Sequence, residues 1–297
     1  MAKIKKSFIF IPLLITVLLI IFGITVLVAN QSNEIKIYTA SEFVRFLEHN
    51  ADKTERNAVL YADIRLDQKV EPTTLACELD GNGHTITVIN NAVYCLFDSV
   101  SETGSVKNLA LAGKLGSTDN EVTAGICVRN LGTIENCIVC ADFSGSGFVS
   151  GLCHTNNGKL LNCFVRSRES DAEDFRYIWN PICAESYGSV KGCRYANASS
   201  GAYDTAGTFV SSDEIKSGSV TEAMDEYAEA NPGLTGWQAD EQGYPTLKPG
   251  GGSQAASVFS GGNSVFLVCI IIMIVAVPIV TIIYADKQKK KVFYNKV

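Results

Sequence analysis

Hydrophobic and polar residues alternate with different periods in different parts of this chain. Two runs, 8–29 and 265–285, are almost wholly apolar, and each is long enough for a helix to cross a hydrocarbon core of about 30 Å. Between them, apolar positions come in short alternating stretches separated by Gly and Asn, which is typical of strands joined by tight turns. The pattern predicts two transmembrane α-helices that flank a β-rich domain.

The charges beside the two apolar runs predict their orientation. Lysines precede the first run and follow the second, whereas the inner flanks 30–34 and 250–264 contain no Lys or Arg. By the positive-inside rule, the tails 1–7 and 286–297 are cytoplasmic and the central region lies outside the plasma membrane. A cleaved secretory signal is the alternative for 8–29, but its apolar region would be about 7–15 residues long, so an uncleaved signal anchor is favoured.

The region before residue 90 predicts a helix, a strand and a turn. Phe43, Phe46 and Leu47 fall on one face of a short helix near 39–47, with Thr39 or Ser41 as its cap. Residues 60–66 alternate between apolar and polar side chains, which predicts one half-buried strand. The glycine-rich stretch 79–86 predicts a tight turn.

Three copies of one pattern fill residues 124–141, 150–167 and 180–197. Each copy has two cysteines ten residues apart and a glycine five residues after the first: Cys127, Gly132 and Cys137; Cys153, Gly158 and Cys163; Cys183, Gly188 and Cys193. A weaker copy at 95–109 has Leu109 in place of the second cysteine. Short strands without a helical period predict an all-β solenoid in which each copy forms one coil. The third copy departs from the pattern at Asn180-Pro181 and Gly192, so its coil is expected to bend or bulge.

Side-chain alternation predicts which repeat residues fill the core. Arg194 shares one strand face with Ile138 and Phe164, and a charged side chain belongs outside. The opposite face then forms the core, and its residues are Cys137, Cys163, Cys193, Ile134, Val139 and Val165. For the first cysteine of each copy, the alternation leaves open whether the cysteine or the residue before it (Ile126, Leu152 or Ile182) faces inward.

The C-terminal part predicts a cap and a tether. Residues 220–230 read as a helix that Asn231-Pro232-Gly233 ends, and Trp237 with 243–247 reads as a closing strap. Solenoids need such caps because an open end strand invites aggregation. The Gly/Ser-rich stretch 249–264 then predicts a flexible linker to the second apolar run.

The glycine-rich turn, the cysteine repeats and the C-terminal strap together resemble the motifs of GLUG-type repeat proteins. The resemblance rests on the stretch 79–86, the repeated stretches 132–137 and 158–163, and Trp237 with 243–247. It covers about residues 36–248. The resemblance implies a right-handed parallel β-helix at a bacterial surface, with display, adhesion or glycan contact rather than a defined reaction.

The charge and the cysteines narrow the function classes. The chain carries a net charge of −6, but residues 30–264 hold 17 Lys and Arg against 30 Asp and Glu. An exported domain this acidic is not expected to bind nucleic acid. The repeat cysteines could form disulfides in an oxidising compartment, yet ladders of three leave one thiol unpaired, so buried core fillers are favoured.

No cofactor or metal site is predicted from the sequence. Cys137 and Cys140 have a suitable spacing for zinc, but they point to opposite faces of a strand, and the three histidines are scattered. His154 follows Cys153 on a repeat strand and is interpreted as a surface residue.

An acidic and aromatic stretch between the second and third copies is the candidate binding region. Glu169, Asp171 and Asp174 lie beside arginines, and Tyr177 and Trp179 follow them. Mixed charge of this kind is typical of a solvated surface, so a non-enzymatic contact with a glycan or surface protein is favoured. The alternatives are a polysaccharide hydrolase or lyase that uses these acids, and an accessory subunit of a membrane complex.

Overall fold

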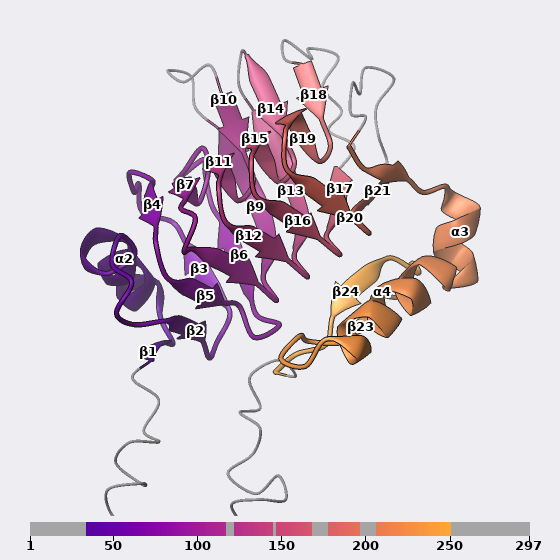
Figure 1. Ribbon diagram of the computed structural model, residues 1–297, viewed down its shortest axis with the longest axis horizontal. Coiled ribbons are helices and arrows are strands. Elements are labelled where there is room, and N and C mark those ends of the chain that lie inside the picture. The colour runs from indigo at the N-terminus through magenta and orange to yellow at the C-terminus, as the bar shows by residue number, and fades with distance from the viewer. Residues whose placement is uncertain (1–33, 117–121, 145–146, 168–177, 197–205, 251–297) are drawn as a thin grey trace, which may run out of the picture. The chain divides into compact units, whose positions relative to one another are not determined.

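The chain folds as a parallel β-solenoid of about six turns (Figure 1). This computed structural model describes residues 34–116, 122–144, 147–167, 178–196 and 206–250. Each strand of a coil is hydrogen-bonded in parallel to the equivalent strand of the next coil, so four sheets run along the solenoid. The all-β solenoid expected from the repeats is confirmed.

Two seven-stranded sheets form two sides of the coils. Sheet A consists of β1 (Ile35–Ile37), β2 (Ala58–Leu60), β5 (Glu78–Asp80), β8 (Ser105–Lys107), β12 (Thr133–Glu135), β16 (Lys159–Leu161) and β20 (Ser189–Lys191). Sheet B consists of β3 (Ile64–Leu66), β6 (Thr85–Val88), β9 (Ala110–Gly116), β13 (Ile138–Ser144), β17 (Phe164–Ser167), β21 (Arg194–Ala196) and β22 (Thr208–Phe209).

Two smaller sheets complete the coils. Sheet C consists of β4 (Thr73–Leu75), β7 (Phe97–Val100), β11 (Cys127–Asn130), β15 (Cys153–Asn156) and β19 (Cys183–Ser186). Sheet D consists of β10 (Val122–Ala124), β14 (Phe148–Ser150) and β18 (Ile178–Asn180). From the third coil onward, the chain therefore passes through sheets A, B, D and C in turn.

The repeat copies stack in register, one copy to a coil. Cys127 pairs with Cys153 and Cys153 pairs with Cys183 across sheet C. The weaker copy is a true coil as well, because Phe97 occupies the position of Cys127 in the preceding turn. The first coils contain Cys77 and Cys95 but lack the repeated pattern of two cysteines with a glycine between them, so the sequence repeat did not reveal these coils.

The third copy continues the solenoid without a bend. Its strands β20 and β21 pair in register with β16 and β17. Gly192 has a φ of 64°, close to the 48° of Asn162 one coil earlier, so it occupies the same left-handed position. Glycine adopts this conformation freely. The expected distortion at Gly192 is therefore wrong.

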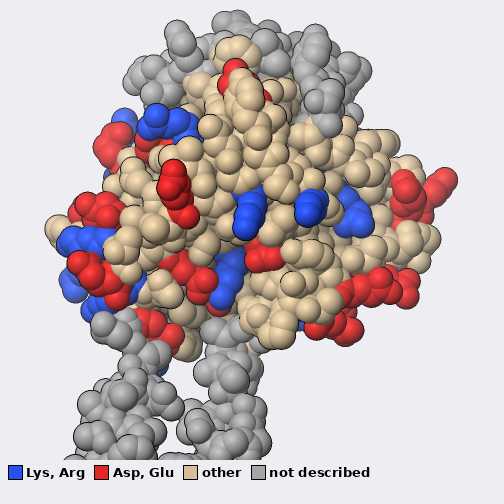
Figure 2. Space-filling view, in the orientation of Figure 1, with Lys and Arg blue, Asp and Glu red and all other residues tan. Residues whose placement is uncertain are grey.

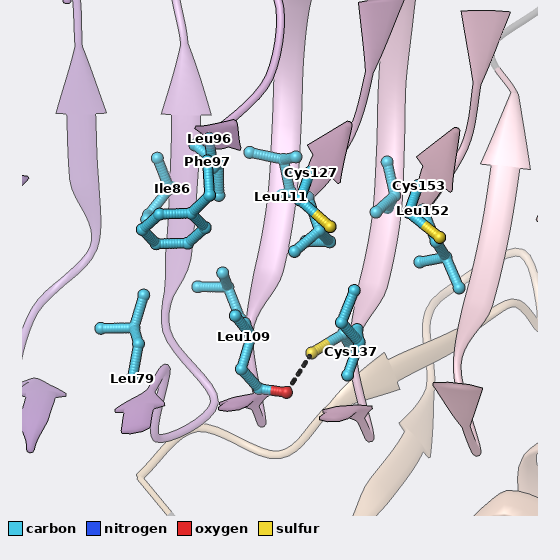
Figure 3. Packing of buried hydrophobic residues seen from close by; sticks show 14 of the residues in the cluster. Leu79, Ile86, Leu96, Phe97, Leu109, Leu111, Cys127, Cys137, Leu152 and Cys153 are labelled. Carbon is cyan, nitrogen blue, oxygen red and sulfur yellow. Dashed lines mark hydrogen bonds between the residues drawn. The ribbon is translucent and has the colours of Figure 1, made fainter. Parts of the chain in front are cut away.

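The second cysteines of the copies lie in the core, on the side that the alternation predicts. Cys137, Cys163 and Cys193 are at most 2% exposed, and Ile134, Val139 and Val165 are fully buried beside them. Figure 3 shows Cys137 beside Leu109 in this core.

The first cysteines and the residues before them are both buried, which answers the question that alternation left open. Ile126 and Cys127 are each 0% exposed, and both backbone N–H groups donate to the carbonyl of Leu152. A corner between sheets D and C falls at these residues, so two successive side chains point inward. Figure 3 shows Cys127 and Cys153 in equivalent places on neighbouring coils.

The N-terminal elements agree with the sequence except at one corner. Helix α2 (Ala40–His49) begins with a capping box between Thr39 and Glu42 and buries Phe43, Phe46 and Leu47, as predicted. The single strand expected at 60–66 is wrong, because the chain turns between β2 and β3 and the alternation runs through a corner.

The C-terminal cap covers one side of the solenoid rather than its open end. Helices α3 (Ser212–Ser217) and α4 (Ser219–Ala230) and the antiparallel hairpin of β23 (Trp237–Ala239) and β24 (Pro245–Leu247) form it (Figure 1). Met224, Trp237 and Leu247 pack on the outward-facing Ile138 and Phe164 of sheet B. Arg166 adds a hydrogen bond to Gln242 and lies over the ring of Tyr244, 3.5 Å from its centroid.

A ladder of asparagines holds the cap against the solenoid. Asn108, Asn136 and Asn162 occupy the corner between sheets A and B with φ near 50°, and their amides donate to one another in sequence at 2.9 Å. The same amides bond the cap, since Asn136 donates to the Thr235 carbonyl and accepts from the indole N–H of Trp237. The ladder therefore satisfies buried polar groups on both sides of the interface.

Membrane-spanning segments are not seen among the residues that the structure describes. None of the helices in this part of the chain has both the length and the apolar character to cross a bilayer. The predicted spans 8–29 and 265–285, with their tails and most of the linker, lie outside the described residues.

The buried thiols should resist modification until the domain unfolds. Burial and a hydrogen bond with Cys137 hold the pKa of the Cys163 thiol well above its ordinary value, which suppresses the reactive thiolate. Among the described cysteines, only Cys140 is partly exposed. We expect a soluble thiol reagent to label Cys140 quickly and the repeat cysteines only in denaturant, with no gain after a reductant. A count that rises after reduction would show disulfides instead.

Substitution of Asn136 should loosen the cap. Asn136→Ala removes the ladder amide and places a less tolerant residue at positive φ, with an expected loss of about 3 kcal/mol in the free energy of unfolding. Asn136→Gly keeps the backbone conformation, as Gly192 does naturally, and should lose less. Urea unfolding followed by tryptophan fluorescence measures both. Equal stability of the alanine variant and the wild type would contradict the role of the ladder.

Candidate functional site

The structure describes one of the five binding residues expected from the sequence. Glu169, Asp171, Asp174 and Tyr177 lie outside the described residues. Trp179 is only 5% exposed, and its ring packs 5.3 Å from that of Phe143 in the core. Trp179 is therefore a packing residue and does not offer a surface contact, because position 179 of β18 is the inward-facing one.

The most distinctive exposed feature is the corner where β14 turns into β15. Gly151 makes this turn, and a β-carbon there would come within 1.9 Å of the Pro181 carbonyl in the next coil. A β-carbon at Gly125 would likewise come within 2.1 Å of the Gly151 carbonyl. The tight stacking of these turns requires glycine and fixes the direction in which each strand leaves the corner.

Two rings meet on the outer side of this corner. Val149 and Cys153 point into the core, so the residues next to them, Phe148 and His154, point outward. Their ring centroids are 5.4 Å apart at an interplanar angle of 56°. Phe148 remains 43% exposed, and His154 is half-buried beneath it. Strands β14 and β15 thus turn their outer surfaces toward each other. We call Phe148, Ser150 and His154 the aromatic corner.

Polar atoms at the aromatic corner lack partners. Ser150 is 0% exposed, and neither its Oγ nor the Nδ1 of His154 has a hydrogen-bond partner among the described residues. Buried polar atoms are nearly always hydrogen-bonded, and exceptions call for an explanation such as a ligand or water. Burial lowers the pKa of His154, and the negative charge of Glu185 opposes this effect without cancelling it. Because the pKa is lowered, the imidazole is neutral near pH 7.

This arrangement suits binding better than catalysis. A serine nucleophile needs a base within hydrogen-bond reach, and Ser150 Oγ makes no such contact in the described part of the chain. Within the same residues, no group of three His, Cys, Asp or Glu side chains is placed to hold a metal ion. The exposed ring of Phe148 instead offers an apolar contact face.

Of the two rings at the aromatic corner, the sequence predicts the outward direction of His154 but not its contact with Phe148. Once Cys153 is placed in the core, alternation places His154 on the outer surface, which agrees with the surface position predicted for it. It did not reveal Phe148 as the partner of His154, because the two are six residues apart and meet only when the chain turns sharply at Gly151. Sequence composition gives no measure of that angle.

No family model matches the chain, and no curated protein matches it, so the GLUG resemblance stays a prediction. A solved structure from Bacteroides ovatus, described as a "putative immunoglobulin A1 protease", is similar over 74% of this chain and 93% of its own. Its sequence identity is 15% and its TM-score 0.37. A likeness at this level carries no conclusion about activity.

Titration of His154 should reveal its burial. The pKa of His154 in the folded protein lies below the ordinary value of 6.5. The folded state is therefore fully stable with respect to this group above pH 6.5, where His154 is neutral, and it loses stability as the pH falls through the folded pKa and the buried imidazole is protonated. We expect the ring-proton NMR shifts of His154 to titrate with a midpoint below the ordinary histidine value of 6.5, with His154→Gln to assign the signal. A midpoint at or above that ordinary value would contradict the burial.

Proposed function

We propose that this chain is a membrane-tethered cell-surface β-solenoid that binds a glycan at the aromatic corner without cleaving it. The observation that carries the proposal is the exposed Phe148 ring in contact with the half-buried imidazole of His154. Strands β14 and β15 hold the two rings, so this contact surface is formed before a ligand arrives.

The chemistry of the corner favours a sugar as ligand. A sugar ring has an apolar C–H face that packs on an exposed aromatic ring such as that of Phe148. The ligand is expected to be uncharged, because the described surface carries many carboxylates. Figure 2 shows Asp and Glu predominating over α3 and α4, where Glu222, Glu226 and Glu229 are exposed. Such a surface repels a polyanion.

The proposed tether rests on the sequence and on the position of the domain's two ends. The hydroxyl of Tyr61 donates to Glu34 at the start of the domain. The N–H of Gly250 donates to the carbonyl of Asn82, whose own amide donates to Leu60, next to Tyr61. The segments that continue to the predicted spans 8–29 and 265–285 therefore leave from neighbouring places in the first coils. Two anchors starting there are compatible with a domain held close to one bilayer.

Glycan binding by paired aromatic variants tests the proposal. The full-length protein is applied to an array of neutral and acidic glycans, and hits are measured by calorimetry. We expect Phe148→Ala to weaken a neutral-glycan hit by roughly tenfold or more, since loss of a stacked ring costs about 1–3 kcal/mol. Phe209→Ala is the matched control, because Phe209 is equally aromatic and 53% exposed but lies at the end of sheet B.

Each outcome of this experiment is informative. If neither Phe148→Ala nor Phe209→Ala changes glycan binding, the aromatic corner is not the binding site. If the wild-type protein binds no glycan on the array, the proposed class of ligand is wrong. Shortened glycans after incubation would support the polysaccharide-active alternative. In that case Asp171→Asn/Asp174→Asn tests the acidic stretch named from the sequence.

A further inference from the structure

A second chemical constellation lies on sheet A, away from the aromatic corner. Lys107 of β8 stands directly beside Asp80 of β5, because the two residues are register partners on neighbouring strands. Glu78 lies on the same strand as Asp80, two residues earlier, and points to the same outer face. One amine and two carboxylates are therefore gathered within a single pair of strands.

The amine and the buried carboxyl are close enough to react. Lys107 Nζ lies 3.7 Å from Asp80 Oδ2, and the side chains are 23% and 5% exposed. Both groups are anchored on strands that are hydrogen-bonded to each other, so they approach without rearranging the backbone. Such pre-positioning replaces a bimolecular encounter by an effectively unimolecular one.

Groups that would assist condensation surround the pair. Glu78 Oε1 lies 3.0 Å from Lys107 Nζ and can accept its proton. The backbone N–H of Asn82 and the side-chain amide of Asn108 donate to Asp80 Oδ1, at 2.8 and 3.0 Å. These two donors fix one carboxyl oxygen and would stabilise the negative charge that it gains in a tetrahedral intermediate. The other oxygen, Oδ2, faces the amine.

We propose that Lys107 and Asp80 condense into an intramolecular isopeptide bond that covalently joins the second and third coils. Lys107 Nζ attacks Asp80 Cγ and forms the N–C bond. The Cγ–Oδ2 bond then breaks. Glu78 transfers protons from Nζ to Oδ2, so that Oδ2 leaves as a water molecule. The amine and the carboxylic acid become an amide and one water, and Glu78 ends unchanged. The step needs neither an oxidant nor an added co-reactant.

The charges of the starting pair are compatible with this route. Burial raises the pKa of Asp80, against the hydrogen bonds from Asn108 and Asn82. The pKa of Lys107 is also raised, because its two carboxylate partners outweigh its desolvation. The reacting form, a neutral amine facing a protonated Asp80, is reached by moving one proton within the pair. That form is a minor species, so the bond is expected to accumulate slowly after folding.

Mass spectrometry of the full-length protein tests the proposal directly. The denatured chain should be lighter than its sequence mass by one water, and trypsin should release a branched peptide that joins Lys107 to Asp80. Lys107→Arg keeps the positive charge but cannot condense and should restore the sequence mass. Asp80→Asn should lose ammonia instead of water. Glu78→Gln should slow formation by roughly a hundredfold or more.

A matched ion pair serves as control. Lys248 and Asp225 lie 2.8 Å apart, but their side chains are 45% and 23% exposed, so water competes for both groups. Lys248→Arg should leave the mass loss unchanged. The unaltered sequence mass in folded wild-type protein after prolonged incubation would overturn the proposal, and so would a branched peptide that maps to Glu78. Neither result depends on glycan binding or on whether a variant folds.

Discussion

The later coils of the solenoid turn from sheet A to sheet B at a backbone corner that most residues adopt only with strain. The corner residue lies in the left-handed region, and it is Asn108, Asn136, Asn162 and, in the last coil, Gly192. Asparagine tolerates this conformation and adds an amide, so the same side chains that permit the corner also bond the corners above and below. The corner thereby sets the register of both flanking sheets.

The position of the cap follows from that ladder. Each corner amide carries two N–H groups and an oxygen, and its bond within the ladder leaves one N–H free to donate elsewhere. These N–H groups donate to backbone carbonyls of the cap between residues 224 and 235. Trp237 contributes both a hydrogen bond to Asn136 and a fully buried ring, which couples the polar ladder to the apolar contact with sheet B. Sheet B can therefore carry Ile138 and Phe164 on its outer face without exposing them.

In-register stacking also creates the two chemical sites. On sheet A it places Lys107 beside Asp80, two residues that are distant in sequence and neighbours in space. At the opposite side of the coil, the turn at Gly151 brings Phe148 and His154 together. Both sites rest on short, rigid strands, and their geometry is fixed by the backbone rather than by loops.

The sequence by itself determined the class of fold, the coil boundaries in the repeats and the inward direction of Cys137, Cys163 and Cys193. These follow from spacing and from strand alternation, which are local properties of the chain. Helix α2 was likewise readable from Thr39, Glu42 and its apolar face. Helix α3 was missed, although the pairing of Ser211 with Glu214 is a capping box that could have revealed it.

Only the tertiary structure decided what happens where the chain turns a corner. Alternation could not decide whether Ile126 or Cys127 faces the core, because both side chains point inward at a bend. It also predicted a single strand across the corner at 61–63, where the structure has two strands. The prediction of Trp179 as a binding residue rested on its acidic and aromatic neighbours in sequence, whereas the register of β18 turns that ring inward. The candidate site depends on the angle between β14 and β15, and packing between neighbouring coils sets that angle, which no periodicity encodes.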